Sequence, residues 1–168
     1  MKILFKFLTV FVLLHPCFQN VFALTSDDKV AIEKIVQDLA DSWNEKEGVG
    51  FGVNFSDDAD FVNIFGMHFS GKAEIEDRHI KILQTMFKNS KLQMVKTTLR
   101  EIQPGVVIAL IQWKLDAKKS PITLSSKYFD EIREGIFTNV FLYANNKWVI
   151  TASQNVIKPY PLSKSTSH

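Results

Sequence analysis

The chain has 168 residues, of which 46% are hydrophobic and 23% are charged. These values are typical of one globular domain and exclude a disordered or fibrous protein. The formal net charge is only +2, so the chain lacks the strongly basic character on which nucleic-acid binding depends. No nucleic-acid partner is therefore expected.

The first 23 residues are predicted to be a secretory signal peptide. Lys2 and Lys6 flank an apolar run that ends at Leu14, and Ala23 supplies the small residue of a cleavage site. A membrane span needs about 20 uninterrupted apolar residues, and Lys6 and His15 leave too short a run, so no stable membrane anchor is expected. Cleavage near Ala23 predicts a secreted or periplasmic protein.

Removal of this segment changes the charge and the cysteine content. Lys2 and Lys6 leave with it, so that 18 basic residues balance 18 acidic ones, and Cys17 is the only cysteine of the chain. The mature protein then has no disulfide, and a core alone must hold its roughly 145 residues, a size at which about two thirds of the unfolded surface becomes buried. We expect one domain over residues 24–160 and a flexible tail over 161–168.

A first helix is predicted over Asp27–Glu45. Thr25 or Ser26 supplies a hydroxyl cap, and acidic residues follow in the first turn, where the helix dipole favours them. Large apolar residues then recur at spacings of three and four, which is typical of one buried helix face: Ile32, Ile35, Val36, Leu39 and Trp43. Trp43, at the end of this face, either packs in the core or lines a pocket.

The next stretch combines glycine-rich sequence, a strand and another helix. Gly48, Gly50 and Gly52 lack the spacing of a phosphate loop and indicate a joint before a short second helix or turn. A strand over 58–65 and a turn region over 66–71 follow. Gly71 then opens a helix whose inward stripe is predicted to include His79.

Beyond Lys91 the apolar period changes to two, which indicates strands. Pro104–Gly105 and Asn145–Asn146 are predicted to be tight turns, with a longer loop over 117–128. The predicted strands are Lys91–Gln103, Val106–Ala117, Gly135–Ala144 and Lys147–Ile157. Helices followed by antiparallel strands predict an α+β fold in which helices pack on one concave sheet.

Several motifs in this order resemble the SnoaL-like branch of the nuclear transport factor 2 superfamily, and most closely its SgcJ/EcaC group. The resemblance covers essentially the whole chain after the signal peptide. The motifs are Ser42-Trp43-Asn44, Asp58-Ala59-Asp60-Phe61-Val62-Asn63, Gly71-Lys72-Ala73-Glu74-Ile75, Arg78-His79 and Trp148-Val149-Ile150-Thr151-Ala152-Ser153-Gln154-Asn155.

The resemblance implies a cone-shaped barrel, in which a curved antiparallel sheet wraps around helices and leaves a pocket open at one end. It does not imply one function, because relatives include cyclases, isomerases, dehydratases, hydrolases and non-catalytic association domains. The aspartate-histidine pairs of the cyclases and dehydratases have no counterpart at the carboxyl end, where Gln154 and Asn155 stand instead.

The local periodicities place a group of polar and aromatic residues on inward faces. Such a cleft, apolar with a few convergent polar groups, is the usual description of a ligand site. The predicted ligand-binding residues are Trp43, Asn63, Trp113, Thr138 and Gln154, with His79 beside them. We therefore predict a pocket for a small apolar molecule or a partner.

An enzyme is the alternative interpretation of the same residues. His79 would act as general acid or base, with Asp60 orienting it. Asn63 and Gln154 would polarise a carbonyl or hydroxyl group. In the non-catalytic interpretation these polar residues satisfy one another, and His79 is a core residue tied to a carboxylate or carbonyl.

The remaining expectations concern metals, cofactors and assembly. No metal site is expected, because the histidines lack paired ligand spacing and the mature chain lacks cysteine. No cofactor is expected either. A homodimer through the outer sheet face is predicted, because one set of helices can cover only one face of several long strands.

Overall fold

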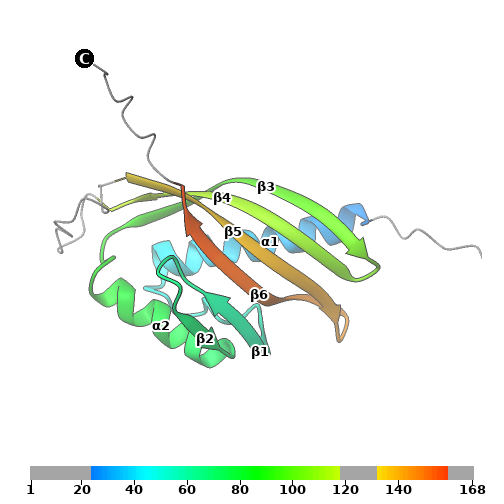
Figure 1. The fold of residues 1–168 in the computed structure, drawn as a ribbon, viewed down its shortest axis with the longest axis horizontal. Helices are drawn as coiled ribbons and strands as arrows, with labels where there is room; N and C mark the ends of the chain where they lie inside the picture. The colour runs from blue at the N-terminus through cyan, green and yellow to red at the C-terminus, as the bar shows by residue number, and fades with distance from the viewer. Residues whose placement is uncertain (1–23, 118–131, 159–168) are drawn as a thin grey trace, which may run out of the picture.

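The computed structural model describes residues 24–117 and 132–158 (Figure 1). The predicted signal peptide, the predicted tail and most of the loop predicted over 117–128 lie outside these residues. Within these described residues six strands form one sheet in the order β2-β1-β6-β5-β4-β3, with β1 and β6 parallel and the other neighbours antiparallel. The elements are α1 (Ser26–Glu45), β1 (Phe55–Val62), β2 (His68–Ser70), α2 (Lys72–Gln84), β3 (Lys91–Gln103), β4 (Val106–Asp116), β5 (Ile132–Ala144) and β6 (Lys147–Ile157). The predicted α+β class is confirmed.

The long helix α1 begins with a capping box. The Thr25 hydroxyl accepts a hydrogen bond from the Asp28 backbone N–H, and the Asp28 carboxylate accepts one from the Thr25 backbone N–H. These two bonds satisfy donors that a helix start leaves unpaired. None of the helices in the described residues is both long enough and apolar enough to span a membrane.

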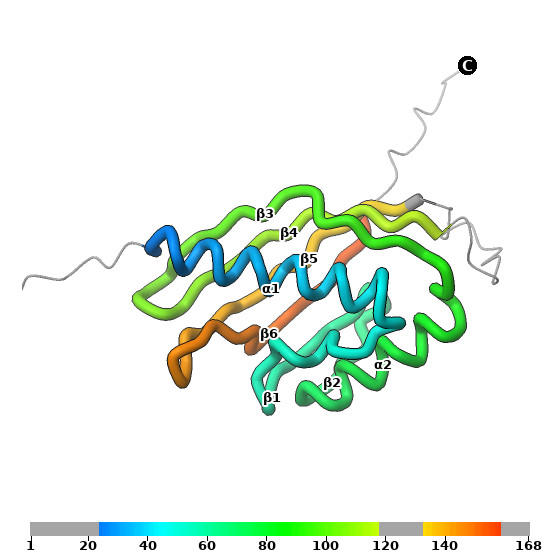
Figure 2. The backbone as a smooth tube through the Cα atoms, turned by 180° about the vertical axis from the view of Figure 1, so that it is seen from behind, coloured from blue at the N-terminus to red at the C-terminus, as the bar shows by residue number. Residues whose placement is uncertain are grey.

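Helix α1 lies across one face of the sheet, as Figure 2 shows from behind, and α2 lies beside β1 and β2. The covered face is apolar because side chains alternate along each strand. On β4 this face is formed by Val107, Ala109, Ile111, Trp113 and Leu115, all at most 4% exposed. The predicted inner face of this strand is confirmed, and it forms the core with α1.

The region between residues 55 and 71 differs from its prediction. Strand β1 ends at Val62, and the side-chain oxygen of Asn63 accepts hydrogen bonds from the backbone N–H groups of Phe65 and Met67. An asparagine side chain that bonds the backbone in this way closes a turn. The chain therefore turns over 63–67, and His68–Ser70, predicted as part of a turn, returns as β2.

Candidate functional site

A cavity of about 60 Å³ lies between the end of α1, the β1–β2 turn, α2 and the inner face of the sheet. One buried water needs roughly 10–15 Å³, so the cavity has room for more than a single water. Its polar wall residues are Asn63, Arg78, His79, Arg133 and Asn155. Most of the remaining wall is apolar and includes Trp43, Phe61, Ile82, Phe87, Trp113 and Phe137.

Four residues predicted for the pocket line this one cavity: Trp43, Asn63, His79 and Trp113. They come from α1, the β1–β2 turn, α2 and β4, so segments far apart in the chain meet there. Their role in binding a ligand stays a prediction.

The predicted inward orientation of Thr138 and Gln154 is wrong. Both are exposed, and they pair with each other across β5 and β6 on the opposite face of the sheet. For Thr138 the cause is the alternation of β5, which turns Phe137 and Asn139 inward. For Gln154 the cause is a β-bulge: Val140 pairs with Ala152, but Phe141 pairs with Ile150. The extra residue in β6 reverses its alternation, so the residues that point inward after the bulge are Ser153 and Asn155.

The predicted pairing of Asp60 with His79 is also wrong. Alternation along β1 turns Ala59 and Phe61 inward and leaves Asp60 outside, with a side chain 59% exposed. Its carboxylate lies 2.6 Å from Nε2 of His68 instead. Asp60 therefore cannot orient His79 from this position.

His79 is held by its own helix and by aromatic rings. Its Nδ1 lies 2.7 Å from the carbonyl oxygen of Ile75, and a carbonyl can only accept, so Nδ1 carries the proton. The imidazole stacks on Phe51, with centroids 3.6 Å apart, and meets Phe61 edge-on at 5.1 Å. Nε2 is then the nitrogen that carries a lone pair.

Burial lowers the pKa of His79 from 6.5 to about 4. The bond to the Ile75 carbonyl raises the pKa in part, and the positive charge of Arg78 lowers it further. The cationic ring loses its hydration in this apolar site, which is the dominant effect. At neutral pH His79 is therefore uncharged and presents an acceptor at Nε2.

Trp113 and Asn155 are joined in the cavity wall. The indole Nε1–H of Trp113 donates to Oδ1 of Asn155 over 2.8 Å. The indole of Trp43 makes a comparable bond to the Ser90 hydroxyl over 3.0 Å. Both rings thus present their apolar faces with their polar N–H groups satisfied, which keeps the wall apolar.

Three wall or support residues were not predicted from the sequence. Asn155 was missed because Gln154 was predicted to point inward and nothing in its neighbours signals the bulge. Arg133 precedes the predicted start of its strand at Gly135, although it shares the inward alternation of Phe137 and is 4% exposed. Phe51 belongs to the glycine-rich stretch that was interpreted as a joint, yet it is 1% exposed and carries the stack on His79.

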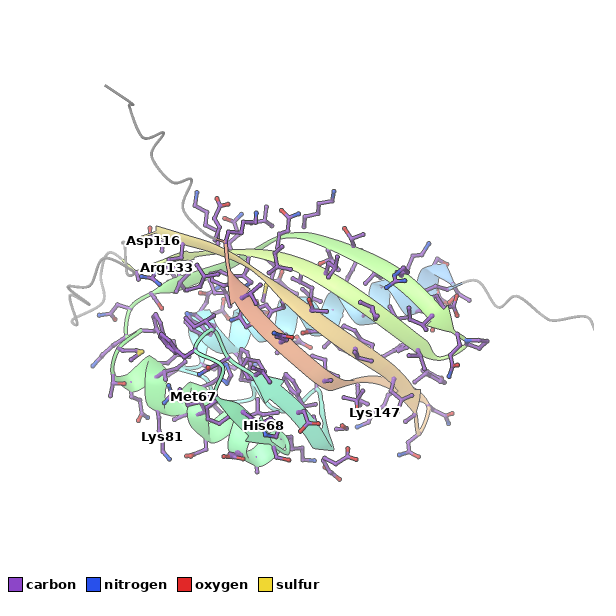
Figure 3. All side chains as sticks on the ribbon, in the orientation of Figure 1. Met67, His68, Lys81, Asp116, Arg133 and Lys147 are labelled. Carbon is purple, nitrogen blue, oxygen red and sulfur yellow. The ribbon has the colours of Figure 1, made fainter. Side chains whose placement is uncertain are left out.

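Within residues 24–117 and 132–158, no group of three histidine, cysteine, aspartate or glutamate side chains is close enough to hold a metal ion. The charged groups in the described wall of the cavity are arginines. Arg78 lies over the ring of Phe69 at 5.7 Å from its centroid, and Arg133 stands near Asp116 at the end of the β4–β5 pair (Figure 3).

The fold resembles several solved structures. An uncharacterised protein with a cystatin-like fold from Caulobacter vibrioides is 26% identical, with a TM-score of 0.70 over 79% of this chain and 91% of its own. A nuclear transport factor 2-like protein of unknown function from Shewanella oneidensis is 14% identical, with a TM-score of 0.60 over 76% and 98%. The hexachlorocyclohexane dehydrochlorinase LinA type 2 is 11% identical, with a TM-score of 0.66 over 80% and 88%.

No protein-family model and no curated protein matches the sequence. Assignment to the SgcJ/EcaC group therefore stays a prediction, whereas the broader resemblance is confirmed. The structural likenesses below 25% identity show the fold alone. The protein has a cystatin-like fold, an α+β arrangement in which a curved sheet and two helices of the described residues enclose a cavity.

Proposed function

We propose that this protein binds a small, mainly apolar molecule in the cavity beside His79. The observation that carries the proposal is the wall itself, in which aromatic rings from α1, β4 and β5 surround a few polar side chains. Sites for small molecules have this composition. Trp43 and Trp113 contribute large apolar surfaces there whose N–H groups are already bonded.

An enzyme that uses His79 as a base is the second candidate. It is favoured by the unprotonated Nε2 of His79 in the cavity wall and by the fold shared with a dehydrochlorinase. Two observations weigh against it. A pKa of about 4 makes His79 a weak base at neutral pH, and Asp60, the carboxylate expected to orient it, lies beside His68 instead. Binding is therefore the better-supported proposal.

A thermal-shift screen with a matched pair of variants tests the binding proposal. The screen uses toluene, acetophenone, benzoate and benzylamine as probes, because a ligand that binds only the folded state raises the melting temperature. Ile82→Trp fills the cavity from α2, whereas Ile80→Trp adds the same ring on α2 at a position outside the cavity wall. A probe should stabilise the wild type and Ile80→Trp but not Ile82→Trp. Stabilisation of both variants alike, or of neither the wild type nor Ile80→Trp, would contradict binding in this cavity.

We further propose that a second copy of the chain covers the outer sheet face. Leu110, Leu142 and Val156 are 46%, 38% and 44% exposed there, and Ile108, Val140 and Ala152 form a row between them. An apolar patch of this kind is characteristic of an interaction surface. Light scattering of the wild type should give a dimer mass, and Val140→Lys should give a monomer. A monomeric wild type would contradict the proposal.

Export with cleavage after Ala23 is also proposed. It is supported by the signal-peptide pattern of the first 23 residues and by the position of Leu24, whose backbone nitrogen donates to Oε2 of Glu101 over 2.8 Å. Cleavage at this bond would turn that nitrogen into an ammonium group. The hydrogen bond would then become an ion pair at the start of the domain.

A further inference from the structure

Two asparagines of the cavity wall have their side-chain oxygens already engaged. Oδ1 of Asn155 accepts from the indole N–H of Trp113, and Oδ1 of Asn63 accepts from the backbone N–H groups of Phe65 and Met67. Indole and backbone N–H groups only donate, so these partners decide which amide atom is the oxygen. Besides these engaged oxygens, each asparagine carries an NH₂ group, which can only donate.

The charged residues of the cavity wall are likewise hydrogen-bond donors only. Arg78 and Arg133 line the cavity, and a guanidinium carries five N–H donors and no acceptor. No aspartate or glutamate belongs to the wall among the described residues. Asp116 stands beside Arg133 at the end of the sheet (Figure 3) but is not part of that wall. The described wall of the cavity is therefore mainly apolar, carries two guanidinium groups and is rich in donors.

His79 is the one wall side chain in the described residues that presents an acceptor nitrogen, at Nε2. An anion nearby favours the charged form of a histidine and so raises its pKa. A bound anion would therefore shift the pKa of His79 upward from about 4.

We propose that the ligand is a small apolar monocarboxylate, with its carboxylate at the donors of Asn63, Asn155 and the two arginines. Its hydrocarbon part would lie against Phe61, Phe87 and Phe137. A carboxylate is an acceptor with two oxygens and pairs with guanidinium in a bidentate geometry. This inference rests on the proposed function, because it names the class of molecule that the same cavity takes.

Isothermal titration with three probes of similar size tests the inference. Benzoate carries the carboxylate, benzamide replaces it with a neutral amide, and benzylamine replaces it with a cation. Benzoate should bind at least about tenfold more tightly than benzamide, since hydrogen bonds to a charged group are the stronger ones, and benzylamine should bind most weakly. If benzamide or benzylamine binds as tightly as benzoate, the carboxylate assignment is overturned while the binding function stands.

A pair of isosteric variants assigns the effect to the cavity. Asn155→Asp keeps the acceptor oxygen for Trp113 but replaces the donor NH₂ with a second, negatively charged oxygen. Gln154→Glu introduces the same charge one residue earlier, on the exposed face of β6. Asn155→Asp should weaken benzoate binding at least about tenfold, and Gln154→Glu should leave it nearly unchanged.

The probes and the variants together separate the carboxylate assignment from the proposed binding function. Unchanged benzoate affinity in Asn155→Asp, or equal losses in both variants, would overturn the carboxylate assignment. If none of the three probes binds the wild-type protein, the proposed function fails and the carboxylate assignment fails with it. Near-ultraviolet circular dichroism of each variant reports whether the packing around Trp113 is retained.

Discussion

The imidazole of His79 lies flat on the ring of Phe51, with centroids 3.6 Å apart and planes 12° apart. This stack depends on Gly48, three residues before Phe51, where the glycine-rich stretch touches the backbone of α2. A Cβ at Gly48 would lie 2.7 Å from the nitrogen of Ile80 and 2.8 Å from the carbonyl carbon of His79. The glycine-rich stretch thus packs closely against α2 and positions the ring of Phe51 on the imidazole of His79.

Gly48→Ala should therefore destabilise the protein strongly. Gly48 has a φ of +88°, which costs an alanine about 1 kcal/mol or more, and the clash with the α2 backbone adds to this cost. Gly66→Ala is the matched control, because Gly66 has a φ of +76° and open space around it. Urea denaturation should show a clearly larger loss for Gly48→Ala. Equal losses would mean that the backbone contact is not tight.

The stability of the protein should fall as the pH is lowered from about 6.5 to about 4. The pKa of His79 is about 4 in the folded protein and 6.5 in its ordinary state. Between these values the unfolded chain binds a proton that the folded protein does not. The contribution of His79 to the free energy of unfolding is complete above pH 6.5. It decreases by about 3 kcal/mol toward pH 4 and changes no further below that pH.

Urea denaturation of His79→Phe and His68→Gln at several pH values isolates this effect. The phenylalanine keeps an aromatic ring against Phe51 but cannot bind a proton, so His79→Phe should lose that part of the pH dependence. His68 is an exposed histidine on β2, and His68→Gln should retain the pH dependence that His79 causes. A wild type and His79→Phe with parallel pH profiles would show that His79 is not buried as a neutral ring.

Substitutions at two neighbouring residues of β6 should have unequal effects on stability. Asn155→Leu removes the acceptor of the Trp113 indole and should cost about 1–3 kcal/mol. Gln154→Leu lies on the exposed face and should change the free energy of unfolding by less than about 0.5 kcal/mol. Chemical denaturation followed by tryptophan fluorescence measures both. A larger loss of stability for Gln154→Leu than for Asn155→Leu would contradict the position of the bulge.

Export should leave a protein that begins at Leu24. Its new ammonium group would lie beside the carboxylate of Glu101. Glu101→Gln should therefore lower the melting temperature of the cleaved protein, but it should not lower that of a form acetylated at Leu24. N-terminal sequencing of the protein from its host establishes the cleavage site. A protein that retains Met1 would contradict export.

The regular parts of the fold could be predicted because local chemistry determines them. Asn145 and Asn146 adopt φ values of +52° and +61° in the turn predicted between β5 and β6, and the inner face of β4 follows from strict alternation. The capping box at Thr25 and Asp28 was visible as a hydroxyl followed by acidic residues. These features involve few residues and little tertiary context.

The parts of the site that were mispredicted depend on tertiary context. The bulge between Ile150 and Ala152 shifts β6 by one residue, and such a shift exchanges inward for outward side chains. Asp60 was assigned to His79 because both stand among apolar residues. The alternation of β1 instead turns Asp60 outward, where its carboxylate lies beside His68. Four of the six pocket positions nevertheless meet at one cavity, since their elements were placed correctly.

The central claim, that the cavity beside His79 is a ligand site, is tested most directly by the three indole N–H signals of the protein. Trp43 and Trp113 line the cavity, whereas Trp148 bonds Asp28 outside it and serves as an internal reference. In a ¹⁵N-resolved NMR titration with toluene, the signals of Trp43 and Trp113 should shift together and saturate while that of Trp148 stays in place. Unmoved Trp43 and Trp113 signals, or an equal shift of all three, would contradict the claim.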